Sequence, residues 1–194
     1  MSDGISFETL LENSVLISEN KNYHFEIRLY ADPNKQYQIL FTNGLRTKAQ
    51  EVNDRNFGFE HIELYMLLPE YWNPKKYDWP EEWLNKIAQI PEKNDTWFGL
   101  GDTIPAGNPT KPITDKFKAE YFIISKPMKL DGVLKTKNAG FEFLAVIPIY
   151  KKEFQFKTQF SSIVLFEKFQ EKNISEMIDE FRLPVARKKF LGVI

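Results

Sequence analysis

The sequence predicts a single α+β domain in which a mixed central β-sheet begins with a hairpin and is flanked by helices. Segments with strand-like alternation and segments with helical spacing are interspersed along the chain. Two of the strands, Ala119–Ile124 and Phe141–Ile149, are apolar on both faces, which is typical of strands covered by helices on each side. At 194 residues the chain can bury one sizeable core, and since no linker or repeat divides it, we expect residues 1–194 to form one domain.

The first half of the chain predicts most of the strands. In Tyr23–Tyr30, the apolar residues Phe25, Ile27 and Leu29 alternate with polar ones, and an Asp-Pro-Asn turn leads to a second strand at Tyr37–Thr42. These two strands should pair as the hairpin. A polar loop at 47–56 follows, and a short helix at 6–11 is a weak signal.

A third strand and the first strong helix come next. Phe59–Leu68 places Ile62, Leu64, Met66 and Leu68 on one face and ends at a proline. The following helix should start at Pro80, where proline and two glutamates suit the first turn, and should stop at Pro91. Its apolar stripe is Trp83, Leu84, Ile87 and Ala88.

The second half begins with a loop rich in glycine and proline at 99–112 and then has the two strands that are apolar on both faces. A short helix is expected at Lys151–Lys157. Helical spacing of Phe160, Ile163, Val164 and Phe169 predicts another. The pattern after Glu180 is ambiguous.

Composition excludes several functions. Without cysteine the chain has no disulfide, thiolate nucleophile or iron–sulfur cluster. The N-terminus lacks a signal-peptide pattern, and Phe143–Tyr150, the longest apolar stretch, is too short to span a membrane, so we expect a cytoplasmic protein with no membrane partner.

The net charge is −1, but residues 1–100 carry 16 acidic and 10 basic side chains and the remainder is basic. This asymmetry fits ordinary solvated surface or a polarised docking surface.

Two histidine–glutamate pairs are the only candidates for a metal or acid–base site. His24/Glu26 and His61/Glu63 each place both side chains on one face of a strand, and together they could hold a metal ion. Their alternation with apolar residues places them on the polar side of the sheet, which favours solvated side chains. We therefore expect no catalytic residues, no metal and no cofactor, and a metal-dependent enzyme remains the alternative.

Two further patterns are weak. Gly99-Leu100-Gly101-Asp102-Thr103 lacks the third glycine and the lysine of a phosphate-binding loop, so a tight turn that presents Asp102 is expected. Seven lysines make residues 110–137 mildly basic without a recognition motif, so we expect no nucleic-acid binding. They are Lys111, Lys116, Lys118, Lys126, Lys129, Lys135 and Lys137.

The four tryptophans, Trp72, Trp79, Trp83 and Trp97, lie within 26 residues. Packing of one helix on the sheet explains such a cluster, and so does anchoring of a partner, because tryptophan is enriched at interface hot spots. Both interpretations stay open, and Trp72, Trp79 and Trp97 are the candidate partner-binding residues.

A series of motifs in a fixed order resembles the suppressor of fused (SUFU) domain family from about residue 25 to residue 185. The series is Thr42-Asn43-Gly44-Leu45, Glu63–Pro69, Trp79-Pro80 with Trp83-Leu84, Gly101–Pro105, Phe143–Ile149, Glu153, and Asp179 with Arg182. The resemblance implies a mixed sheet between helices and no catalytic activity. Within the family, the chain resembles stand-alone bacterial members, many of which are regarded as immunity proteins against polymorphic toxins. It also makes Asp102, in the Gly-Asp turn, a candidate partner contact.

The sequence therefore predicts a non-catalytic protein-binding domain, most simply an immunity protein that neutralises a cognate toxin. The acidic N-terminal half could steer it toward a basic toxin such as a nuclease. Besides the metal-dependent enzyme, a second alternative is an adaptor that adds an extended peptide to an exposed sheet edge.

Overall fold

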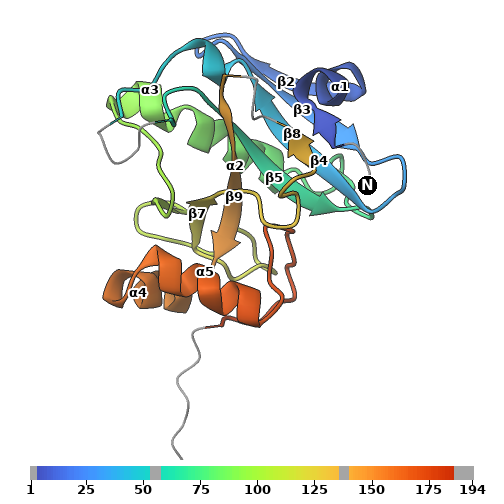
Figure 1. The fold of residues 1–194 in the computed structure, drawn as a ribbon. Coiled ribbons are helices and arrows are strands. Elements are labelled where there is room, and N and C mark those ends of the chain that lie inside the picture. Colours follow the sequence, from blue (N-terminus) through green and yellow to red (C-terminus); the bar gives the residue numbers. More distant parts are fainter. Residues whose placement is uncertain (1–3, 53–57, 136–139, 186–194) are drawn as a thin grey trace, which may run out of the picture.

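A seven-stranded mixed sheet forms the centre of the computed structural model, which describes residues 4–52, 58–135 and 140–185 (Figure 1). Its strand order is β2-β3-β4-β5-β9-β7-β6, and β1 and β8 form a separate parallel pair. The strands are β1 (Ile5–Ser6), β2 (Ser14–Asn20), β3 (Phe25–Ala31), β4 (Tyr37–Asn43), β5 (Ile62–Pro69), β6 (Thr103–Pro105), β7 (Tyr121–Ser125), β8 (Leu134–Lys135) and β9 (Glu142–Ile149). The helices are α1 (Phe7–Glu12), the 3₁₀ turn η1 (Leu45–Thr47), α2 (Trp79–Ala88), α3 (Ile90–Asn94), α4 (Lys151–Gln159) and α5 (Ser162–Glu171). The predicted fold class is confirmed.

The predicted hairpin is β3–β4, in which Tyr30 lies opposite Ile39. Asp32 closes its turn, because the Asp32 N–H donates to the Tyr37 carbonyl and the Gln36 N–H donates to Asp32 Oδ2. Within the seven-stranded sheet, the described ladders are antiparallel except β5–β9, where Leu64 lies opposite Leu144 in a parallel pair.

Strand β2 was not predicted, and it forms one edge of the sheet. Its register with β3 shifts between Leu16 and Ser18, which leaves Ile17 as a bulge. Val15 and Leu16 are both exposed, so β2 lacks the alternation of buried and exposed residues by which a strand is predicted from sequence. A bulge in an edge strand discourages pairing with other chains.

The two faces of the sheet carry two separate cores. Ile62, Leu64, Met66 and Leu68 of β5 pack with α2 on one face, as predicted. On the other face, α1, α4 and α5 pack over β5 and β9, with α1 near one end of the sheet and α4–α5 near the other (Figure 1). Strands β5 and β9 are therefore buried on both faces, which explains their continuous apolar runs.

Two helix predictions need correction. Helix α2 ends at Ala88, and Pro91 lies in the first turn of α3 instead of stopping α2, since a proline there costs no helical hydrogen bond. In α5 the buried residues are Leu165 and Phe169, while Ile163 is exposed, so the predicted stripe was rotated. None of the helices in the described part of the chain has the length and apolar character that a bilayer span requires.

Three fully buried glutamates hold distant segments together. Glu63 accepts hydrogen bonds from Thr42 Oγ1 (2.6 Å), the Gly44 N–H (2.8 Å) and Arg46 Nη1 (2.6 Å). Glu176 accepts from three successive backbone N–H groups, those of Met128, Lys129 and Leu130, and from Tyr65 Oη.

Glu153 links α4 to the segment beyond α5. Arg182 approaches its carboxylate with both terminal nitrogens, at 2.6 and 2.8 Å, and the Val185 N–H donates to it at 3.0 Å. Arg182 Nη2 also donates to the Pro148 carbonyl at 3.0 Å. Only 8% of the Arg182 side chain and none of the Glu153 side chain is exposed. The buried pair thus fixes the stretch that the sequence left ambiguous.

Removing Arg182 should therefore be costly. We expect Arg182→Ala to lower the free energy of unfolding by about 3–5 kcal/mol, because Glu153 would be left as a buried charge without its cation. Urea denaturation of the variant and the wild type measures this difference.

The matched control is Lys86→Ala, which removes an exposed ion pair with Glu82. It should cost about 1 kcal/mol or less. Equal losses for the two variants would show that the Glu153–Arg182 pair has no special role.

Candidate protein-binding face

The three tryptophans predicted as partner-binding residues lie in different surroundings in the structure. Trp72 and Trp79 are only 5% and 6% exposed, and their rings lie 5.7 Å apart, edge to face, within the core beneath α2. Their indole N–H groups donate to the Tyr77 carbonyl and to Glu180 Oε1. Both are core residues, which favours the core-packing interpretation for them over the anchoring of a partner.

Trp97 and Asp102, the other two predicted residues, come together in an open hollow of about 650 Å³. It lies between α3, β6 and α4, and we call it the Trp97 hollow. Asn94, Ile104 and Lys157 contribute to its walls. Trp97 is half-buried, so part of its indole remains available to a ligand.

The Gly-Asp turn that presents Asp102 is attached to β7. The Gly99 N–H donates to Asp102 Oδ2 (2.7 Å), and Gly101 and Asp102 exchange backbone hydrogen bonds with Ile124 (2.8 and 2.9 Å). Gly101 has a φ of +84°, and a Cβ at this position would lie 2.4 Å from Ser162 Oγ. The predicted tight turn is confirmed, and glycine is required there because the turn backs onto α5.

This close approach brings three exposed apolar residues to one area beside the hollow. Leu100 precedes Gly101, and Phe160 and Ile163 flank the Ser162 region at the α4–α5 junction. They are 39%, 57% and 68% exposed. Exposed apolar side chains that gather near a hollow are typical of interaction surfaces.

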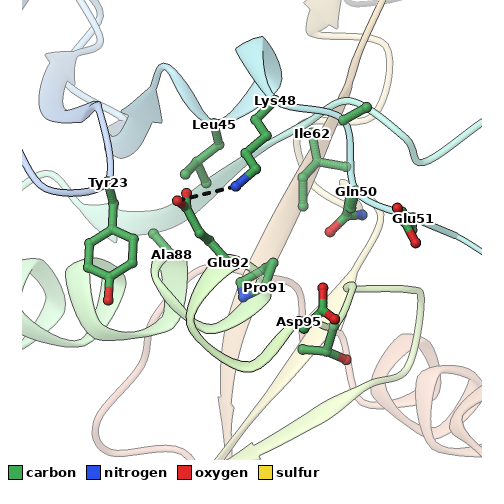
Figure 2. A pocket seen from close by; sticks show the side chains of 12 residues that line it. Tyr23, Leu45, Lys48, Gln50, Glu51, Ile62, Ala88, Pro91, Glu92 and Asp95 are labelled. Carbon is green, nitrogen blue, oxygen red and sulfur yellow. Dashed lines mark ion pairs between the residues drawn. The ribbon is translucent and has the colours of Figure 1, made fainter.

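A second, smaller pocket of about 260 Å³ lies on the other side of α3, and Thr96 lines both (Figure 2). We call it the Glu92 pocket. Lys48 reaches across it from one wall to Glu92 on the other, with 3.2 Å between Lys48 Nζ and Glu92 Oε1. The Trp97 hollow with its apolar rim and the Glu92 pocket therefore adjoin each other at Thr96, and together they are the candidate face.

Gln50 holds the wall of the Glu92 pocket in place. Its amide pairs with the backbone of Phe98, donating to the carbonyl (3.0 Å) and accepting from the N–H (3.0 Å), and it donates to the Phe59 carbonyl as well. The Gln50 N–H also donates to the Glu60 carbonyl. The predicted polar loop at 47–56 is therefore held in place at Gln50.

The first histidine–glutamate pair does not share a strand face. His24 lies in the turn before β3 with a φ of +56° and is exposed. Glu26 accepts hydrogen bonds from Asn43 Nδ2 (3.0 Å) and Arg28 Nη1 (2.9 Å). The Asn43 hydrogen bond, with Arg28 beside it, lowers the pKa of Glu26.

The second pair, His61 and Glu63, departs further from the prediction that both side chains lie on the polar side of the sheet. Glu63 is fully buried rather than on a polar face, and burial raises its pKa although its hydrogen bonds oppose that shift. His61 Nδ1 lies 2.7 Å from the Arg46 carbonyl oxygen. Within the described ranges, no three histidine or carboxylate side chains lie close enough to hold a metal ion.

Of the seven lysines between residues 110 and 137, Lys137 lies outside the described residues, and the side chain of Lys135 is also outside them. The other five are exposed. Their exposure agrees with the interpretation that they are solvated loop residues.

Sequence reasoning missed the Glu92 pocket. Lys48 and Glu92 are 44 positions apart, and neither belongs to a motif. The only available signal was the acidic excess of residues 1–100, which contains Glu51, Glu92 and Asp95. Charge counting alone cannot show which of these carboxylates meet.

Comparisons with known proteins agree on the fold. A suppressor of fused homologue from Neisseria gonorrhoeae is similar with a TM-score of 0.62 at 16% identity, over 93% of each chain. Drosophila Suppressor of Fused is similar with a TM-score of 0.54 at 12% identity, over 83% of this chain but only 42% of the Drosophila chain. A chain in the Sufu–Fu complex is similar with a TM-score of 0.58 at 12% identity, over 89% of this chain and 85% of that one.

A search of curated protein sequences finds no match. The family model for the suppressor of fused protein (SUFU) matches residues 21–182, close to the range over which the motifs resemble that family. The chain therefore belongs to the suppressor of fused family.

Proposed function

We propose that this chain is a non-catalytic protein-binding domain whose face around α3 covers a partner protein. The observation that carries the proposal is the convergence of Trp97 and Asp102 in one hollow beside exposed apolar residues. Tryptophan set among apolar groups and bordered by polar ones is the usual composition of an interface hot spot. A similar chain occurs in the Sufu–Fu complex, so the fold is compatible with binding a protein.

The partner we propose is a toxin, which the domain neutralises in the cytoplasm as an immunity protein, acting as one domain over residues 1–194. An inhibitor without catalytic groups works by occupying a surface, which takes roughly 800 Å² on its own side. The Trp97 hollow, the rim and the Glu92 pocket lie next to one another and can form one such surface. The excess of acidic residues in 1–100 would favour a basic toxin.

The toxin hypothesis predicts a growth phenotype. The tagged chain, purified from its native cells, should retain one stoichiometric partner that can be identified by mass spectrometry. Expression of that partner alone should stop growth, and its expression together with this chain should restore growth. A retained partner that is harmless when expressed alone would contradict the toxin role.

The face itself is tested by substitution. We expect Trp97→Ala to weaken partner binding by about thirtyfold, since truncating a central tryptophan costs about 2 kcal/mol or more. Isothermal titration gives the affinity, and a second variant, Lys157→Ala, checks the same hollow without touching the core.

Leu16→Ala on the exposed edge strand β2 is the control and should leave affinity unchanged. If Leu16→Ala weakened binding and Trp97→Ala did not, the partner would bind by sheet-edge addition, as the adaptor hypothesis holds.

The non-catalytic proposal also predicts the metal content. Elemental analysis of the purified protein should find transition metal well below one ion per chain, because His24 is in a turn and Glu63 is engaged by Arg46. A stoichiometric ion that is lost in the His61→Ala variant would instead support the metal-dependent enzyme.

A further inference from the structure

We propose that the Glu92 pocket receives an arginine side chain of the partner protein. The inference rests on the proposed function, because it assigns a chemical requirement to the partner that the face around α3 binds.

Charge favours a cation in this pocket. Its lining includes the carboxylates of Glu51, Glu92 and Asp95 and a single ammonium, that of Lys48. Lys48 and Glu92 are 68% and 41% exposed, so their ion pair is weakly held and open to exchange. Among the described residues, no basic group lies within 4.0 Å of the Asp95 carboxylate.

The floor of the pocket is apolar, which selects a long side chain over a small ion. Leu45, Ile62 and Ala88 form this floor together with Pro91. The methylene stem of arginine packs on such a surface while its charged end stays at the polar rim. A simple metal ion or ammonium ion would gain nothing from these groups.

The size and geometry of the pocket favour an arginine side chain over a small molecule or an ammonium group. A volume of about 260 Å³ is below the range of roughly 300–1,000 Å³ typical of small-molecule sites, so a single side chain is the better match. Glu92 lies within α3 and Asp95 caps its C-terminal end (Figure 2). A planar guanidinium has five donors and can bind a carboxylate through two of them at once, whereas an ammonium group acts as a point charge.

The pocket is also organised before any partner arrives. Gln50 fixes one wall to Phe98, and on the other wall the Thr96 N–H donates to the Pro91 carbonyl at 2.9 Å. A preformed pocket loses less conformational entropy when it is filled, which makes binding of even one side chain measurable.

The test uses the full chain and two short peptides. Acetyl-Gly-Arg-Gly-amide is titrated into the ¹⁵N-labelled protein, and the same peptide with citrulline, which has nearly the same shape but no charge, is titrated separately. We expect saturable shifts of the Gln50, Asp95 and Thr96 amide signals with the arginine peptide, and at least tenfold weaker binding of the citrulline peptide. Equal effects of the two peptides, or shifts confined to other regions, would overturn the proposal.

Substitutions then separate the pocket from general surface charge. The double variant Glu92→Gln/Asp95→Asn should weaken arginine-peptide binding about tenfold. Glu82→Gln, which removes the same kind of charge from the exposed side of α2, should leave it unchanged. Equal weakening by both would show that only long-range charge is involved and would overturn the pocket assignment.

The outcomes also distinguish the two proposals. If a toxin partner binds with wild-type affinity to the Glu92→Gln/Asp95→Asn variant, the arginine site is wrong and the proposed function stands. If no toxin partner exists but the arginine peptide binds selectively, the pocket assignment stands and the proposed function is wrong.

Discussion

A carboxylate removed from water must be matched by hydrogen-bond donors, and this requirement organises the domain. Glu63, Glu153 and Glu176 are at most 1% exposed, and among the described residues no buried side-chain nitrogen or oxygen lacks a hydrogen-bond partner. Each carboxylate gathers donors from a segment that forms neither helix nor strand of the main sheet. Glu63 holds the turn after β4, Glu176 holds residues 128–130, and Glu153 holds the chain after α5. These three irregular segments are therefore ordered from within the core.

The candidate face is made from such ordered loops. Glu63 fixes Gly44 and Arg46, and the chain then passes directly into the wall of the Glu92 pocket, where Gln50 pairs with Phe98. Phe98 is followed by the Gly-Asp turn, which is tied to β7 and closely packed on α5. Separate hydrogen bonds at successive points of these loops thus attach the Glu92 pocket and the Trp97 hollow to the rest of the fold. Loops positioned by a rigid scaffold are where proteins place most of their binding residues.

Local patterns in the sequence were enough to predict the sheet strands β3, β4, β5, β7 and β9, helix α2 and the Gly-Asp turn, because periodicity and turn chemistry act over a few residues. They could not predict β2, whose exposed, bulged edge shows no alternation. Nor could they show that Glu63 is buried, since its partner Arg46 lies 17 positions away and reaches it only through the β4–β5 register. The same limit explains the tryptophans. Clustering in sequence cannot separate Trp79, the buried first residue of α2, from Trp97, which lines a hollow.

The fold of this family persists at low sequence identity. The similar structures share only 12–16% identity with this chain, yet their TM-scores are 0.54–0.62. A core of two apolar layers tolerates such divergence if volume and patterning are kept. Surface positions such as Lys48, Glu92 and Asp95 contribute little to that core, so they can change without cost to the fold. Because specificity is a difference of affinities, a few charges around a preformed pocket can distinguish partners without any change in the fold that presents them.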